Sequence, residues 1–85
     1  MAYRIMIAPA AAREMKKLDR LVGQQIADTI SGLALDPRPT GVRKLTGSTN
    51  GYRLRVGDYR ILYQITDKVL LVLVVKVGHR RDVYR

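Results

Sequence analysis

The sequence predicts an α+β fold, in which two N-terminal helices pack on one side of a small, mostly antiparallel four-stranded sheet. Apolar residues recur at helical spacing in the first half of the chain, whereas the second half alternates apolar and polar residues. A two-residue turn, Gly57-Asp58, separates two of the alternating segments. We therefore expect the order β-α-α-β-β-β in a single domain spanning residues 1–85, whose 47% hydrophobic content suits one modest core.

The first half begins with a short strand over residues 3–8 and continues into two consecutive helices. Pro9 suits the first turn of a helix, where its missing N–H would be unpaired in any case. Asp19 is a candidate N-cap for the second helix, so we expect a bend near residues 18–20. The sequence "DPRP" at 36–39 cannot continue a helix, which places the end of the second helix near Leu35.

The second half is predicted to form a loop followed by three strands. Residues 36–51 are rich in Pro, Gly, Thr and Ser and indicate a loop. Residues 52–56 and 59–65 alternate as strands joined by a tight hairpin. Residues 69–77 are apolar on both faces, which is typical of a strand inside the sheet.

Composition excludes several kinds of chemistry. The chain has no cysteine, a single histidine and few carboxylates, so we expect no metal site and no other cofactor. Neither a signal peptide nor an apolar run long enough to cross a bilayer is visible, so we expect a cytoplasmic protein without a membrane partner. The formal charge of +9 is concentrated in residues 43–85, which carry ten Lys/Arg against three Asp/Glu. This asymmetry favours a polyanionic partner for the C-terminal half.

Three arginines are predicted to share one face of the hairpin. Alternation places Arg53 and Arg55 on the same side of one strand, about 7 Å apart along it. If the turn has two residues, Arg60 on the next strand lies directly opposite Arg55. Like charges paired across strands are destabilising, so folding alone gives no reason for this pairing. The pattern therefore favours a phosphate-binding site over a merely solvated face.

The segments "LTGSTNGYRLRVGDYRILYQI" and "VVKVGHRRDVYR" resemble the RelE toxins, the messenger-RNA-cleaving members of the RelE/ParE superfamily of type II toxin–antitoxin systems. The resemblance covers essentially the whole chain and implies a microbial-RNase-like fold. It also implies an endoribonuclease, or mRNA interferase, that cuts the message in the A site of the 30S ribosomal subunit without a metal. In that reaction the 2′-hydroxyl attacks the adjacent phosphate, giving a 2′,3′-cyclic phosphate and a free 5′-hydroxyl.

The resemblance also implies roles for individual residues. Arg53 and Arg55 match the two basic residues of the first hairpin strand, and Arg60 matches the arginine that steadies the pentavalent phosphate. Arg80 matches the basic residue near the leaving oxygen. Tyr84 matches the tyrosine that stacks on a base and helps to orient or activate the nucleophile.

The chain departs from the family pattern in two respects. RelE proteins often carry lysines where this chain has Arg53 and Arg55, and arginine stays protonated at any working pH. The general base is therefore either Tyr84, whose phenolate the surrounding cations would favour, or His79, because imidazole commonly serves as a base near neutral pH. Many relatives also continue past the tyrosine into a C-terminal helix, whereas this sequence stops at Arg85.

Further basic residues are candidates for contacts with the message or the ribosome, namely Lys16, Lys17, Arg20, Arg43, Lys44 and Arg81. The resemblance implies a cognate RelB-like antitoxin, and the charge of +9 predicts that this partner is acidic. Two other functions remain open. One is a ParE-type toxin that inhibits DNA gyrase without nuclease activity, and the other is a non-catalytic module that binds nucleic acid.

Overall fold

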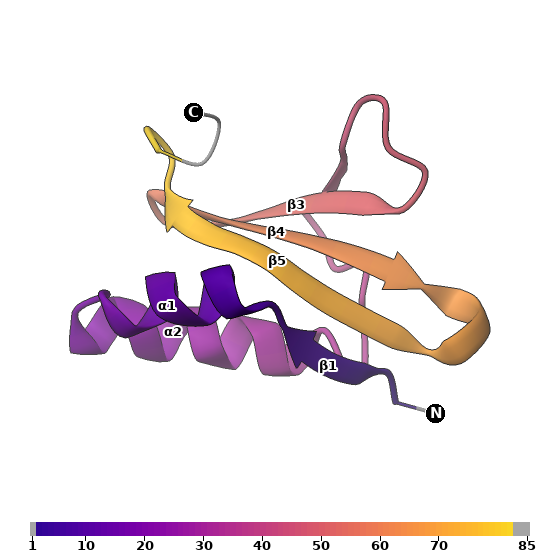
Figure 1. Cartoon of the computed structure of the whole chain (residues 1–85), viewed down its shortest axis with the longest axis horizontal. Coiled ribbons are helices and arrows are strands. Elements are labelled where there is room, and N and C mark those ends of the chain that lie inside the picture. Colours follow the sequence, from indigo (N-terminus) through magenta and orange to yellow (C-terminus); the bar gives the residue numbers. More distant parts are fainter. Residues whose placement is uncertain (1, 83–85) are drawn as a thin grey trace.

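The computed structural model describes residues 2–82 and has two layers, a five-stranded sheet and a pair of helices on one face of it (Figure 1). The sheet order is β1-β5-β4-β3-β2, with β1 parallel to β5 and the other neighbours antiparallel. The elements are β1 (Arg4–Ile7), α1 (Pro9–Lys16), α2 (Arg20–Gly32), β2 (Arg43–Lys44), β3 (Gly51–Val56), β4 (Tyr59–Thr66), the 3₁₀ turn η1 (Asp67–Val69) and β5 (Leu71–His79).

The predicted fold class is confirmed, but the sheet has five strands rather than four. The additional strand, β2, lies in the segment that was expected to be a loop. Its two residues pair with β3, Arg43 opposite Arg53 and Lys44 opposite Tyr52. A strand of two residues is too short to show a period in the sequence, and here it is created by its pairing with β3.

The helix boundaries follow from local chemistry. Pro9 is the first residue of α1, and the Asp19 carboxylate caps α2 by accepting a hydrogen bond from the Val22 N–H at 3.0 Å. The α2 helix ends at Gly32, three residues before the predicted end. The chain then tightens into i→i+3 bonds, of which the last runs from the Leu35 N–H to the Gly32 carbonyl at 3.2 Å.

The core lies between the helices and the sheet. Helix α1 packs on β5 and α2 packs on β3. The fully buried side chains include Ile26 of α2, Ile61 and Tyr63 of β4, and Val72 of β5. The Tyr63 hydroxyl donates a hydrogen bond of 2.8 Å to the Pro37 carbonyl, and burial raises the pKa of Tyr63 to about 12.

A polar network closes the end of the molecule at which β1 begins. Arg38 forms an ion pair with Asp67, with 2.9 Å between Nη2 and Oδ2, and Asp67 also accepts a hydrogen bond of 2.6 Å from the Tyr3 hydroxyl. Arg38 also lies over the Tyr52 ring, 5.2 Å from its centroid. These contacts hold the segment after α2 against the turn between β4 and β5, and that segment leads directly into β2.

Candidate phosphate-binding site

The β3–β4 hairpin places three arginines on the sheet face that the helices leave uncovered. Gly57, with φ of 58°, makes the two-residue turn, and the hairpin pairs Val56 with Tyr59. Arg55 therefore lies opposite Arg60, as predicted, and Arg53 lies opposite Leu62. Their chain neighbours Leu54 and Ile61 are buried on the helix side, which directs the arginines to the opposite face.

Arg60 is a buried cation without an acidic partner among residues 2–82. Only 9% of its surface is exposed. Its Nη1 donates to the Tyr59 carbonyl at 3.2 Å, whereas its Nε has no hydrogen-bond partner. Within the same range the one ion pair joins Arg38 to Asp67, at the other end of the sheet. Burial of an uncompensated charge is costly, so this site is suited to an anion that binds from outside.

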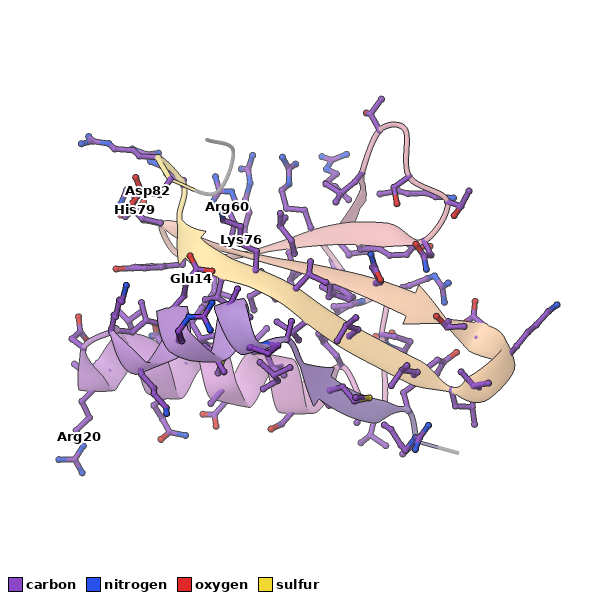
Figure 2. The ribbon with its side chains drawn as sticks, in the orientation of Figure 1. Glu14, Arg20, Arg60, Lys76, His79 and Asp82 are labelled. Carbon is purple, nitrogen blue, oxygen red and sulfur yellow. The ribbon has the colours of Figure 1, made fainter. Side chains whose placement is uncertain are left out.

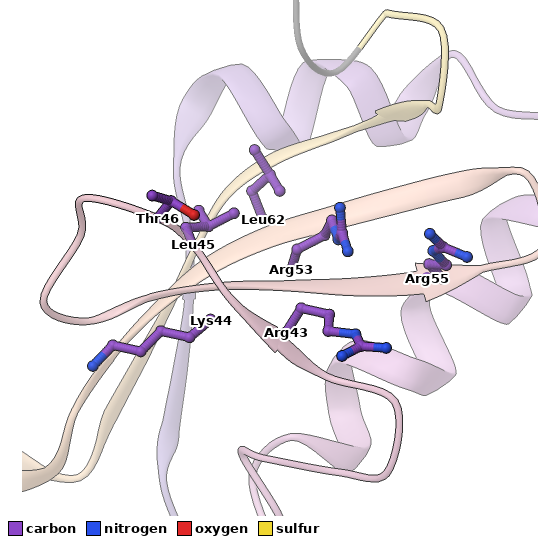
Figure 3. Close-up of a pocket in the computed structure, with 7 residues that line it drawn as sticks. All are labelled: Arg43, Lys44, Leu45, Thr46, Arg53, Arg55 and Leu62. Atoms are coloured by element: carbon purple, nitrogen blue, oxygen red, sulfur yellow. The ribbon is translucent and has the colours of Figure 1, made fainter.

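Strand β2 extends the cationic face. Arg43 pairs with Arg53, so its side chain joins the same face. Arg43, Arg53 and Arg55 line a shallow cavity of about 760 Å³, whose remaining walls are Lys44, Leu45, Thr46 and Leu62. In Figure 3 the three guanidinium groups gather on one side, while Lys44 extends away from them. The sequence indicated only a peripheral contact for Arg43, but the structure places it beside Arg53.

The structure adds Lys76, which sequence reasoning missed. The β4–β5 ladder contains an irregularity, because Leu62 pairs with Lys76 but the next residue, Tyr63, pairs with Val74. Val75 is thus an extra, bulged residue, and it turns Lys76 to the face of Arg60 (Figure 2). The only sequence signal is the doubled apolar pair Val74-Val75, which does not by itself indicate a bulge.

The turn after β5 brings the Arg80 backbone to the hairpin end of the sheet. The Arg80 N–H donates to the Asp58 carbonyl at 2.8 Å, which fixes the start of the turn beside the Gly57-Asp58 loop. The Arg80 and Arg81 side chains are exposed. Tyr84, the other residue expected here, lies outside the described residues.

His79 lies on the helix side of the sheet rather than with the arginines. It follows the buried Val77 at a spacing of two, and its ring meets the Tyr59 ring edge to face with 5.5 Å between centroids. Its Nδ1 accepts a hydrogen bond of 3.2 Å from the Arg81 N–H. A cavity of about 310 Å³ next to it is lined by Glu14 and Leu18 of the helical layer.

The remaining basic candidates belong to a different surface. Lys16, Lys17 and Arg20 lie at the junction of α1 and α2, in the layer opposite the arginine face. Figure 2 shows Arg20 projecting from the helices on the side away from Arg60. The structure therefore separates these three residues from the site.

The described part of the chain offers neither a metal site nor a membrane-spanning helix. Over residues 2–82, no three His, Cys, Asp or Glu side chains come together in a way that could hold a metal ion. No helix in that range is long and apolar enough to cross a membrane.

Comparison with known proteins assigns this α+β domain to a class of toxins. Residues 5–84 match the model of the family described as the ParE toxin of the type II toxin–antitoxin system parDE. Toxin RelG of Mycobacterium tuberculosis is 32% identical, with 100% of this chain and 99% of RelG aligned. The mRNA interferase toxin RelE of Escherichia coli K12 is 33% identical, with 94% of this chain and 85% of RelE aligned.

Solved structures agree with the sequence relatives. The RelE–RelB complex of Pyrococcus horikoshii contains a chain with a TM-score of 0.85 at 26% identity, covering 96% of this chain and 99% of that one. The isolated RelE toxin of Escherichia coli has a TM-score of 0.81 at 30% identity, covering 98% of this chain and 92% of that one. The chain belongs to the RelE/ParE family of type II toxin–antitoxin toxins.

Proposed function

We propose that this chain is a ribosome-dependent endoribonuclease that cleaves messenger RNA in the ribosomal A site and so inhibits translation in the cytoplasm. The observation that carries the proposal is Arg60, a guanidinium with 9% exposure, directly opposite Arg55 and without an acidic partner in the described range. Such an arrangement destabilises the folded protein, and a bound phosphate offsets this cost by neutralising the buried charge. The relative named mRNA interferase toxin RelE supports RNA as the source of that phosphate.

The chemistry follows from what this face can offer. The 2′-hydroxyl of the message attacks the adjacent phosphorus, the P–O5′ bond breaks, and the products are a 2′,3′-cyclic phosphate and a 5′-hydroxyl. Arg60, with Arg53 and Arg55, neutralises the charge on the pentavalent phosphorane, which preorganised cations do without a metal. Arg80 stands at the hairpin end of the sheet, where its guanidinium can stabilise the departing 5′-oxygen until a water molecule protonates it to the 5′-hydroxyl.

The proton of the 2′-hydroxyl needs an acceptor. The position of His79 on the helix side supports Tyr84 as the residue that orients the nucleophile and takes this proton. Tyr84 also provides an aromatic surface on which a base can stack.

A cognate antitoxin is part of the proposal. Solved relatives include RelE–RelB complexes, and the formal charge of +9 favours an acidic partner that is captured by long-range attraction. We expect this RelB-like antitoxin to shield the Arg53/Arg55/Arg60 face, or to displace the Tyr84 segment, and thereby to abolish cleavage.

The ParE-type function is the second candidate, because the matching family model is described as a ParE toxin. The two functions are separated by inducing the protein in a bacterium and mapping message ends and DNA breaks from the same cells. The matched variants are Arg60→Ala and Arg13→Ala, where Arg13 is an exposed arginine of α1. We expect cuts within translated messages for the wild type and Arg13→Ala, and none for Arg60→Ala. DNA breaks without message cuts would establish the ParE-type function, and neither lesion would leave only a binding module.

A further inference from the structure

Lys76 reaches the arginine face because of one extra residue in β5. Val72 and Val74 are fully buried against the helices, and the next fully buried valine is Val77, so the spacing changes from two to three. The Val75 bulge causes this change, since Leu62 pairs with Lys76 and Tyr63 pairs with Val74. Bulges of this kind re-aim side chains and are common beside active sites.

The sheet register makes Lys76 a close neighbour of the arginines. One row across the sheet runs Arg43, Arg53, Leu62 and Lys76, from β2 to β5. Arg60 lies two residues before Leu62 on β4, so it is the diagonal neighbour of Lys76, within about 8 Å between Cα atoms. Arg60 faces Gly78 on β5, and that residue contributes no side chain beside it. Figure 2 shows Lys76 and Arg60 on the same side of the sheet, away from the helices.

Leu62 is therefore an apolar floor with cations around it. Arg53 and Lys76 flank it across the strands, and Arg60 precedes it along the strand. Lys76 is half-buried and, over residues 2–82, forms no ion pair with a carboxylate. A low-polarity floor strengthens the interaction of each cation with an anion placed above it. A lysine turned toward Arg60 does not stabilise the fold, because the two charges repel each other. The same lysine does stabilise a bound phosphate.

We propose, on the basis of the nuclease function proposed above, that Lys76 is a further catalytic residue whose ammonium group contacts the phosphate bound by Arg60. Arg55 lies opposite Arg60 on the β3 side, and Lys76 is its diagonal neighbour on the β5 side, two residues before Gly78. The ammonium donates to a non-bridging oxygen of the phosphate and shares its negative charge in the phosphorane. The site thus encloses the phosphate from both neighbouring strands rather than from one.

The test is single-turnover cleavage of a message on programmed ribosomes at saturating toxin. Lys76→Met should lower the cleavage rate by about 10- to 100-fold, the usual consequence of losing a hydrogen bond from a charged donor. Lys76→Arg keeps a cation on the same face and should recover most of that loss. Lys68→Met is the matched control, because this exposed lysine lies in η1, between β4 and β5, and its loss changes the net charge equally.

A second measurement separates a phosphate contact from a structural role. Binding of a single-stranded DNA oligonucleotide, which has no 2′-hydroxyl to attack, should show a shallower salt dependence for Lys76→Met, by about 0.7 in log K against log salt. Lys68→Met should keep the wild-type slope.

Cleavage by Lys76→Met at the rate of Lys68→Met, with an unchanged salt slope, would overturn the role of Lys76 and leave the nuclease function standing. A wild type that cuts no message would overturn both proposals. If Lys76→Met fails to fold, Lys76→Gln and Lys76→Arg replace it, and equal cleavage rates for these two variants would overturn the role of Lys76.

Discussion

Removal of the Arg60 guanidinium should make the free protein more stable and the toxin inactive. Arg60→Met keeps an unbranched side chain of similar length and removes only the charged head. The buried Nε without a partner and the like charge of Arg55 both oppose folding in the native protein. Methionine removes both of these unfavourable interactions, and its flexible apolar side chain can fill the space of the arginine side chain.

The magnitude follows from three contributions. Satisfying or removing an unpaired buried polar group changes the free energy of unfolding by about 1–3 kcal/mol. Loss of the cross-strand repulsion with Arg55 adds several tenths of a kcal/mol. Against these stands the lost hydrogen bond from Nη1 to the Tyr59 carbonyl, about 1 kcal/mol. The net expectation is a stabilisation of about 1 kcal/mol, which for a domain of this size raises Tm by about 4–8 °C.

Thermal unfolding and cleavage are measured on the same preparations. Cleavage by Arg60→Met should fall by about 10²- to 10³-fold, as expected when a preorganised group that stabilises transition-state charge is lost. Inorganic pyrophosphate should raise the Tm of the wild type and leave that of Arg60→Met almost unchanged, because only a folded state with an anion site gains from the ligand. The exposed Arg13→Met variant serves as the control for the loss of one charge.

A lower Tm for Arg60→Met, with Arg13→Met unchanged, would refute the reasoning. Arg60 would then be a stabilising element of the fold, and its burial would carry no information about an anion. A higher Tm together with unchanged cleavage would show that the buried Arg60 destabilises the fold but takes no part in the cleavage reaction.

Two further predictions concern the rest of the molecule. The hydrogen bond from Arg38, followed by that from Tyr3, lowers the pKa of Asp67, so its contribution to stability is present above the unfolded carboxyl pKa near 4 and is lost as pH falls through the folded value. Urea unfolding should therefore show that the wild type loses more stability than Asp67→Asn between pH 6 and pH 3, and parallel losses would contradict this. Neutralising Lys16, Lys17 and Arg20 together should weaken ribosome binding and flatten its salt dependence without slowing cleavage of a bound message; an unchanged slope would make them ordinary surface residues.

The parts of the fold that the sequence predicted are those in which local chemistry and the hydrophobic pattern agree. Gly57-Asp58 permits one tight hairpin, and strict alternation on either side of it leaves a single register, so the pairing of Arg55 with Arg60 follows from the sequence alone. Pro9 and Asp19 likewise mark helix starts by mechanisms that need no tertiary context. These positions were confirmed for that reason.

The parts that were missed depend on contacts between distant segments. Strand β2 exists because the chain after α2 is held by the Arg38 network and then reaches the free edge of β3. Nothing in residues 36–51 has the length or the period of a strand. Tyr84 was predicted from family resemblance alone and remains a prediction.

The Val75 bulge has a consequence for the chemistry of the site. Continued alternation from Val72 and Val74 would direct residues 76 and 78 to the helices and would place His79 on the arginine face. The extra residue exchanges these positions, so Lys76 joins Arg60 while His79 packs against Tyr59. One inserted residue therefore decides which of two titratable side chains enters the site. Arg53, Arg55 and Arg60 contribute guanidinium groups to this face, and Lys76 adds an ammonium group beside them. A guanidinium group donates to a phosphate in fixed directions, whereas an ammonium group on a flexible side chain can follow the phosphate oxygens as the trigonal-bipyramidal phosphorane forms.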